Sequence, residues 1–174
     1  MGKSGSGKDF LARELCAFPS PYHRVVVTTT RPRREYEIDG VDYHFMAEVP
    51  FLFGQETFND WHYGVRETDL NKNKINICVL SPKAIWNFIQ EAKVFNLLIE
   101  YVIIRIKEDD KTRLMRQLSR EEKPNVKEII RRFSADAADF ADLPFENYEI
   151  VDNSKNDNGI SALRALRAIL LKRP

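Results

Sequence analysis

The sequence has few cysteines, no long apolar run and almost no net charge. Its two cysteines, Cys16 and Cys78, form no disulfide framework and match no metal-binding spacing. No stretch approaches the roughly 18 consecutive apolar residues of a transmembrane helix, and the first ten residues lack the apolar core of a signal peptide. The 27 Lys and Arg residues balance 26 Asp and Glu, which argues against binding nucleic acid through bulk electrostatics. These absences predict a cytoplasmic protein that acts on neither membranes nor nucleic acid, and they leave its oligomeric state open.

The length and the apolar pattern indicate one α/β domain. The chain has 174 residues and is 43% hydrophobic, which suits a single domain spanning 1–174. Short β-branched runs alternate with segments of helical spacing, and this order predicts a doubly wound, mostly parallel sheet covered by helices. We expect strands at 24–30, 42–46, 55–63, 75–80, 97–106 and 148–151. We expect helices at 9–18, from Pro82, at 109–118, from Asn125 and at 160–172.

A glycine-rich segment carries the first chemical motif. Residues 2–8, GKSGSGK, fit the phosphate-binding pattern G-x-x-x-x-G-K, and a helix follows at once. Glycines let successive N–H groups turn toward phosphate oxygens, and Lys8 supplies a charge for the β- and γ-phosphates. The motif therefore predicts ATP binding by Gly2, Ser4, Gly5, Ser6, Gly7, Lys8 and Asp9. Asp9 stands where the motif has Ser or Thr, so its carboxylate is the candidate ligand for Mg²⁺. Only Met1 precedes the loop, where the motif expects a strand, so that first strand is apparently missing.

Three arginines follow the predicted strand 24–30. Arg31, Arg33 and Arg34 fall within four residues, and the planar guanidinium group suits bidentate contact with phosphate. Tyr43 can add a phenolic hydrogen bond to the same anion. The segment therefore indicates anion capture, with a solvated charged hairpin as the alternative.

The same segment resembles a known family. Residues 28–45, TTTRPRREYEIDGVDYHF, resemble the segment T-T-R-P-x-R-x-G-E-x-D-G-x-D-Y-x-F of the guanylate kinase family, and the phosphate loop lies upstream at that family's distance. The resemblance implies transfer of a phosphoryl group from ATP, with Mg²⁺, to a nucleoside monophosphate, most often GMP or dGMP. It implies a monophosphate-binding region near 31–65 and a lid near 107–132. The substrate-binding residues it implies around the acceptor's phosphate are Arg31, Arg34, Glu37, Tyr43 and Tyr63.

The C-terminal half resembles the lid and the adenine side of the same family. Arg113-Leu114, Arg120 and Arg131-Arg132-Phe133 are similar to the arginines of its lid. The resemblance implies that Arg120 and Arg132 act in catalysis with Lys8, while Arg116 is a further candidate. A solvated helix face is the alternative for each. Asn153 is similar to the family's asparagine on the ATP base.

Two positions that would read the nucleobase depart from the family pattern. Ser81 stands where the family has an aspartate, and Gly54 stands where it has a glutamate. Glu56, two residues further on and hence on the same face of a regular strand, is the candidate replacement. The sequence therefore predicts a retained phosphate site and an altered base site. The open alternatives are a kinase for another nucleotide, or a nucleotide- or protein-binding module with weak or lost catalysis.

Overall fold

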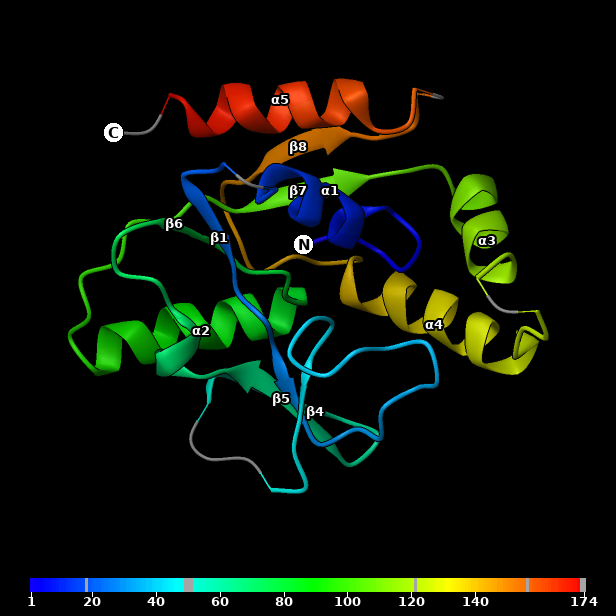
Figure 1. Ribbon diagram of the computed structural model, residues 1–174, viewed down its shortest axis with the longest axis horizontal. Helices are drawn as coiled ribbons and strands as arrows, with labels where there is room; N and C mark the ends of the chain where they lie inside the picture. The colour runs from blue at the N-terminus through cyan, green and yellow to red at the C-terminus, as the bar shows by residue number, and fades with distance from the viewer. Residues whose placement is uncertain (18, 49–51, 121, 156, 173–174) are drawn as a thin grey trace. The chain divides into compact units, whose positions relative to one another are not determined.

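The computed structural model describes residues 1–17, 19–48, 52–120, 122–155 and 157–172 (Figure 1). Two compact units divide the chain. The first unit comprises Met1–Leu15 and Tyr101–Pro174, so it joins the two ends of the sequence. The second unit comprises Cys16–Glu100.

The first unit is built on a short parallel pair of strands. β7 (Ile104–Lys107) pairs with β8 (Glu149–Asp152). The backbone before the phosphate loop lies on the other side of β7, because the Met1 amino group donates to Ile104 O at 2.8 Å and Gly2 forms a parallel bridge with Ile106. Met1 and Gly2 therefore pair with β7 as the end of a first strand would. The helices of this unit are α1 (Lys8–Leu15), α3 (Asp110–Leu118), α4 (Val126–Asp139) and α5 (Ile160–Leu170).

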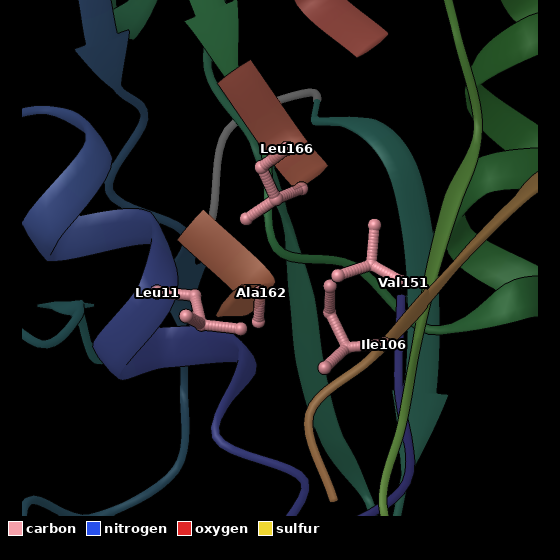
Figure 2. Close-up of a cluster of buried hydrophobic side chains, with 5 residues drawn as sticks. All are labelled: Leu11, Ile106, Val151, Ala162 and Leu166. Atoms are coloured by element: carbon pink, nitrogen blue, oxygen red, sulfur yellow. The ribbon is translucent and has the colours of Figure 1, made fainter. Parts of the chain in front are cut away.

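The core of the first unit joins α1 and α5 to the two strands. Figure 2 shows its five buried side chains pointing toward one another from α1, β7, β8 and α5. They are Leu11, Ile106, Val151, Ala162 and Leu166. α5 packs against β8, as Figure 1 shows, and also against α1. This packing fixes the start of α1, and so the end of the glycine loop, against the sheet.

The second unit contains two small sheets and one long helix. β1 (Tyr22–Arg24) pairs in parallel with β6 (Ile75–Ile77). The other sheet has the order β3-β2-β5-β4, from β2 (Thr28–Thr29), β3 (His44–Phe45), β4 (Phe53–Phe58) and β5 (Trp61–Val65). A 3₁₀ turn, η1 (Glu67–Asp69), follows, and α2 (Pro82–Val94) packs along β4. The core here is formed by Val25, Val27, Phe53 and Val65.

The predicted α/β class is confirmed, since helices alternate with strands and three of the strand pairs are parallel. The strands are shorter than predicted and, in the described residues, fall into three sheets. The clearest error is the central strand at 97–106, of which only β7 forms. Its ladder extends only as far as β8 and Met1–Gly2 reach, because a strand needs partners for its N–H and C=O groups. Leu98 lies fully exposed as a result. Ile130 of α4 is also apolar but 60% exposed.

A backbone contact between β4 and α2 explains why position 54 is glycine. Gly54 has φ +62°, and a Cβ there would lie 2.6 Å from the Ala84 carbonyl oxygen. Its N–H donates to Glu91 Oε2 at 2.6 Å. No side chain, glutamate included, fits at this position without displacing α2.

Gly54→Ala is therefore expected to destabilise the protein more than the same substitution at a glycine that does not contact another backbone segment. The loss should be about 3 kcal/mol, since positive φ and a backbone clash add together. Gly40→Ala is the matched control, because Gly40 has φ +74° while its Cβ would come no closer than 4.0 Å to any atom outside its two chain neighbours. Denaturant unfolding of both variants measures the difference. Equal losses would contradict the proposed contact.

None of the helices in the described ranges is long and apolar enough to cross a membrane.

Candidate functional site

The glycine loop in the first unit has the geometry of an anion site. Gly5 and Gly7 both have positive φ, at +79° and +85°, which turns the backbone tightly before α1. Among the described residues, the N–H groups of Gly5, Gly7 and Lys8 donate to no other group. Unpaired N–H groups at a helix N-terminus, together with the helix dipole, attract a phosphate. Lys8 Nζ lies 3.4 Å from Asp9 Oδ2, so a cation and a carboxylate stand together at this end of the helix.

Two helices hold the loop at Ser4. Arg113 of α3 donates from Nε to Ser4 O at 2.9 Å, and the Ser4 N–H donates to Asp136 Oδ2 at 2.8 Å. Arg113 and Asp136 also pair with each other at 2.5 Å. Ser4 was predicted to contact ATP. Its N–H and carbonyl groups instead form hydrogen bonds with Asp136 and Arg113.

Two further side chains contact the loop. Arg116 donates from Nη1 to Gly5 O at 3.2 Å and lies 2.7 Å from Glu108 Oε2. Burial raises the pKa of the Glu108 carboxyl despite this arginine. Asn153, predicted to lie at the ATP base, donates from Nδ2 to Ser6 O at 2.9 Å. In the structure Asn153 therefore supports the phosphate loop directly.

The predicted lid arginines differ in their surroundings. Arg120 is exposed just after α3. Arg131 donates to both oxygens of Glu128 at 2.7 and 2.9 Å, and Arg132 donates to one of them at 2.9 Å. These hydrogen bonds lower the pKa of Glu128 to about 2. Glu128 therefore stays ionised near neutral pH and keeps its hydrogen bond from Arg132.

A buried ion pair forms the centre of the cluster in the second unit. Arg31 donates from Nη2 to Glu37 Oε1 at 2.7 Å and Oε2 at 3.0 Å, and both side chains are buried. Burial opposes the Arg31 charge, but the hydrogen bond and the charge of Glu37 outweigh it and raise the pKa of the guanidinium group. Burial likewise opposes the Glu37 charge, and the bonds from Arg31 and Arg34 prevail and lower the pKa of the carboxyl.

Three more residues surround that ion pair. The Arg34 N–H donates to Glu37 Oε2 at 2.9 Å, while the Arg34 side chain remains about one-third exposed. The Arg31 guanidinium lies over the Tyr43 ring at 5.4 Å, and the Tyr43 and Tyr63 rings are 6.2 Å apart. All five predicted ligands of the acceptor's phosphate therefore lie in one connected cluster.

The two candidate base-reading residues are in direct contact. Ser81 caps α2 by accepting from the Ala84 N–H, and its hydroxyl donates to Glu56 Oε2 at 2.5 Å. The register of β4 shifts between Phe53 and Glu56, so the alternation used to place Glu56 does not hold across that step. Glu56 nevertheless pairs opposite Tyr63, and the two side chains share a face of the sheet.

Sequence reasoning missed Asp136. It lies on the inward stripe of α4 at helical spacing from Ile129 and Phe133, where an apolar residue is expected. A charged residue on an otherwise apolar stripe was the available signal. Arg113 was noted only as a lid arginine, yet it is 1% exposed.

The class of protein follows from these features: an α/β protein with a glycine loop, a lysine at the start of the next helix and an arginine-rich anion cluster. Its fold matches the crystal structure of guanylate kinase from Anaplasma phagocytophilum, with a TM-score of 0.64 and 17% identity, over 99% of this chain and 84% of that one.

The guanylate kinase family model matches residues 1–169, and the chain therefore belongs to the guanylate kinase family. Guanylate kinase from Chlamydia trachomatis is 28% identical over 181 residues, covering 97% of this chain and 83% of that protein. Guanylate kinase from Zymomonas mobilis is 51% identical over 47 residues, or 27% of this chain and 21% of that protein. The family supports nucleotide binding and kinase activity.

Proposed function

We propose that the protein is a nucleoside monophosphate kinase that transfers the γ-phosphoryl group of ATP to GMP or dGMP. The observation that carries this proposal is the buried Arg31–Glu37 pair with Arg34, Tyr43 and Tyr63 beside it, in a member of the guanylate kinase family. Such a cluster offers a buried guanidinium, a partly exposed one and phenolic hydroxyls to a single phosphate.

Phosphoryl transfer needs charge neutralisation and positioning more than a protein nucleophile. In our proposal Lys8 neutralises charge on the transferring group, and Arg120 and Arg132 join it. Arg132 would have to leave Glu128, whose carboxylate holds it at 2.9 Å. Arg116, already at the loop through Gly5 O, is a closer candidate than Arg120.

The loop residues fit the phosphates of ATP through the N–H groups of Gly5, Gly7 and Lys8, which bond to no other group in the part of the chain that the structure describes. Asp9 is the residue we propose for Mg²⁺. Magnesium commonly takes one or two protein carboxylates beside phosphate oxygens and waters, so a single carboxylate at the loop suits it. When bound, the ion supplies further neutralisation of phosphate charge.

A panel of acceptors tests the function. Purified protein with ATP and Mg²⁺ is assayed for ADP release with GMP, dGMP, AMP, UMP and CMP. We expect turnover with GMP or dGMP. Turnover with another acceptor would instead support a kinase of different base specificity. Folded protein without turnover on any acceptor would support the binding-module alternative and refute the proposal.

Glu56→Gln is expected to change which base is accepted. A carboxylate accepts from the two adjacent N–H donors of guanine, whereas an amide pairs a donor and an acceptor, as adenine requires. Losing one such bond should lower kcat/KM for GMP about tenfold relative to AMP. The KM for ATP should stay unchanged. Glu67→Gln removes the same charge at an exposed position of η1 and is the control. If the ratio of kcat/KM for GMP to that for AMP is unchanged, Glu56 does not contact the base.

A further inference from the structure

Two charged side chains are buried beside the phosphate loop without a role in nucleotide contact. Arg113 of α3 is 1% exposed and Asp136 of α4 is 9% exposed, and their Nη2 and Oδ2 atoms are 2.5 Å apart. Burying two charges costs desolvation that their mutual attraction barely offsets, so a buried pair is weak evidence of a stabilising role. Stability alone therefore does not explain this pair.

Both side chains bind the same residue of the loop. Arg113 Nε donates to the Ser4 carbonyl, and the Ser4 N–H donates to Asp136 Oδ2. The Ser4 hydroxyl also donates to Asp136 Oδ1 at 3.3 Å. The peptide groups on both sides of Ser4 are thus fixed by charge-assisted bonds, and neither can rotate without breaking one.

The loop touches the backbone of α3 at the next residue. A Cβ at Gly5 would lie 2.6 Å from the Arg113 carbonyl oxygen, so the glycine permits this close approach. Phe133 of α4 covers the Arg113 guanidinium, with 4.5 Å from Cζ to the ring centroid. The start of the loop is therefore held by α3 and α4 together.

We propose that Arg113 and Asp136 are positioning residues that set the shape of the phosphate loop through Ser4, and thereby its affinity for ATP. This inference rests on the proposed function. The N–H groups of Gly5 and Gly7 bind one phosphate only if they converge on it. Rotation of the peptide at Ser4 would turn them apart, although Arg113 and Asp136 touch no nucleotide themselves.

The double variant Arg113→Leu/Asp136→Ala separates positioning from stability. Replacing both members of a buried ion pair by apolar residues often keeps the fold, whereas removing one leaves a buried charge. We expect a cooperative unfolding transition close to that of the wild type. We expect ATP to bind about tenfold more weakly in isothermal titration, because the three hydrogen bonds at Ser4 are lost. The KM for ATP should rise equally, while kcat at saturating ATP and the KM for GMP stay near wild type.

Asp110 provides a matched control, because it pairs with the same arginine. Asp110 pairs with Arg113 Nη1 at 2.5 Å, but its side chain is 76% exposed, and among the described residues it has no hydrogen bond or ion pair with the loop. Asp110→Asn should leave ATP binding unchanged. Hydrogen exchange adds a direct measurement, since the Ser4 amide should be protected in the wild type and in Asp110→Asn but not in the double variant.

The outcomes separate this inference from the proposed function. A folded double variant that binds ATP as tightly as the wild type would overturn it and leave the kinase proposal standing. A wild-type protein that binds no nucleotide would overturn both. If the double variant does not fold, Asp136→Asn replaces it, keeping the size and one acceptor oxygen. It should raise the KM for ATP and not that for GMP, and an equal rise in both would contradict the inference.

Discussion

Lys8→Met is expected to lower kcat by about a thousandfold, because one preorganised charge on a transferring group contributes on this scale. The fold should survive, since the Lys8 side chain is about one-quarter exposed and, among the described residues, forms an ion pair only with the neighbouring Asp9. Steady-state ADP release with saturating ATP and GMP measures the loss, and circular dichroism checks the fold.

Lys3→Met is the control for Lys8. Lys3 belongs to the same loop and carries the same charge, but its recorded contact is the backbone carbonyl that accepts from the Ser6 N–H. Its replacement should change kcat far less. Comparable losses in the two variants would mean that general positive charge, rather than a specific lysine, drives the reaction.

Arg31→Met is expected to cost about 3 kcal/mol of folding stability, because it leaves the Glu37 carboxylate buried without its main partner. It should also raise the KM for the acceptor by more than tenfold, since the contact that we propose between Arg31 and the acceptor's phosphate is lost. The double variant Arg31→Met/Glu37→Leu should recover stability without recovering acceptor binding. Recovery of both would show that Arg31 is only structural.

The pH dependence of folding stability provides a second test of the Arg31–Glu37 pair. Arg31 lowers the pKa of Glu37 below its ordinary value of 4.5, so the pair's contribution is present above that pH and is lost as pH falls through the folded-state pKa. In Arg31→Met the Glu37 carboxylate keeps only its contacts with Arg34, so burial disfavours its charge more than in the wild type. The stability difference between wild type and variant should therefore shrink as pH falls below about 4.5. A stability difference that stays constant from pH 7 to pH 3 would contradict a stabilising ion pair between Arg31 and Glu37.

The features that were predictable from sequence depend on neighbours along the chain. The helices expected from Pro82 and from Asn125 both form, and Ser81 and Asn125 cap them by accepting from an N–H three residues on. The Thr28–Phe45 segment encodes its own cluster, because Arg31 and Glu37 are only six residues apart. Short separations of this kind leave a pattern that the sequence displays.

The features that were missed depend on partners far along the chain. Ser4 and Asp136 are 132 residues apart, and nothing local indicates that an acidic residue on α4 binds a loop amide. The strand expected at 97–106 is limited to β7 for a similar reason, since its length depends on β8 and on Met1–Gly2. Apolar content predicted a buried strand, but pairing partners decided where it forms.

Product analysis of a reaction containing ATP, Mg²⁺ and GMP tests the central claim most directly. Chromatography should show one ADP and one GDP formed for each ATP and GMP consumed, with no free phosphate. ATP consumed with release of phosphate and no GDP, or no consumption by folded protein, would contradict a kinase acting on this acceptor.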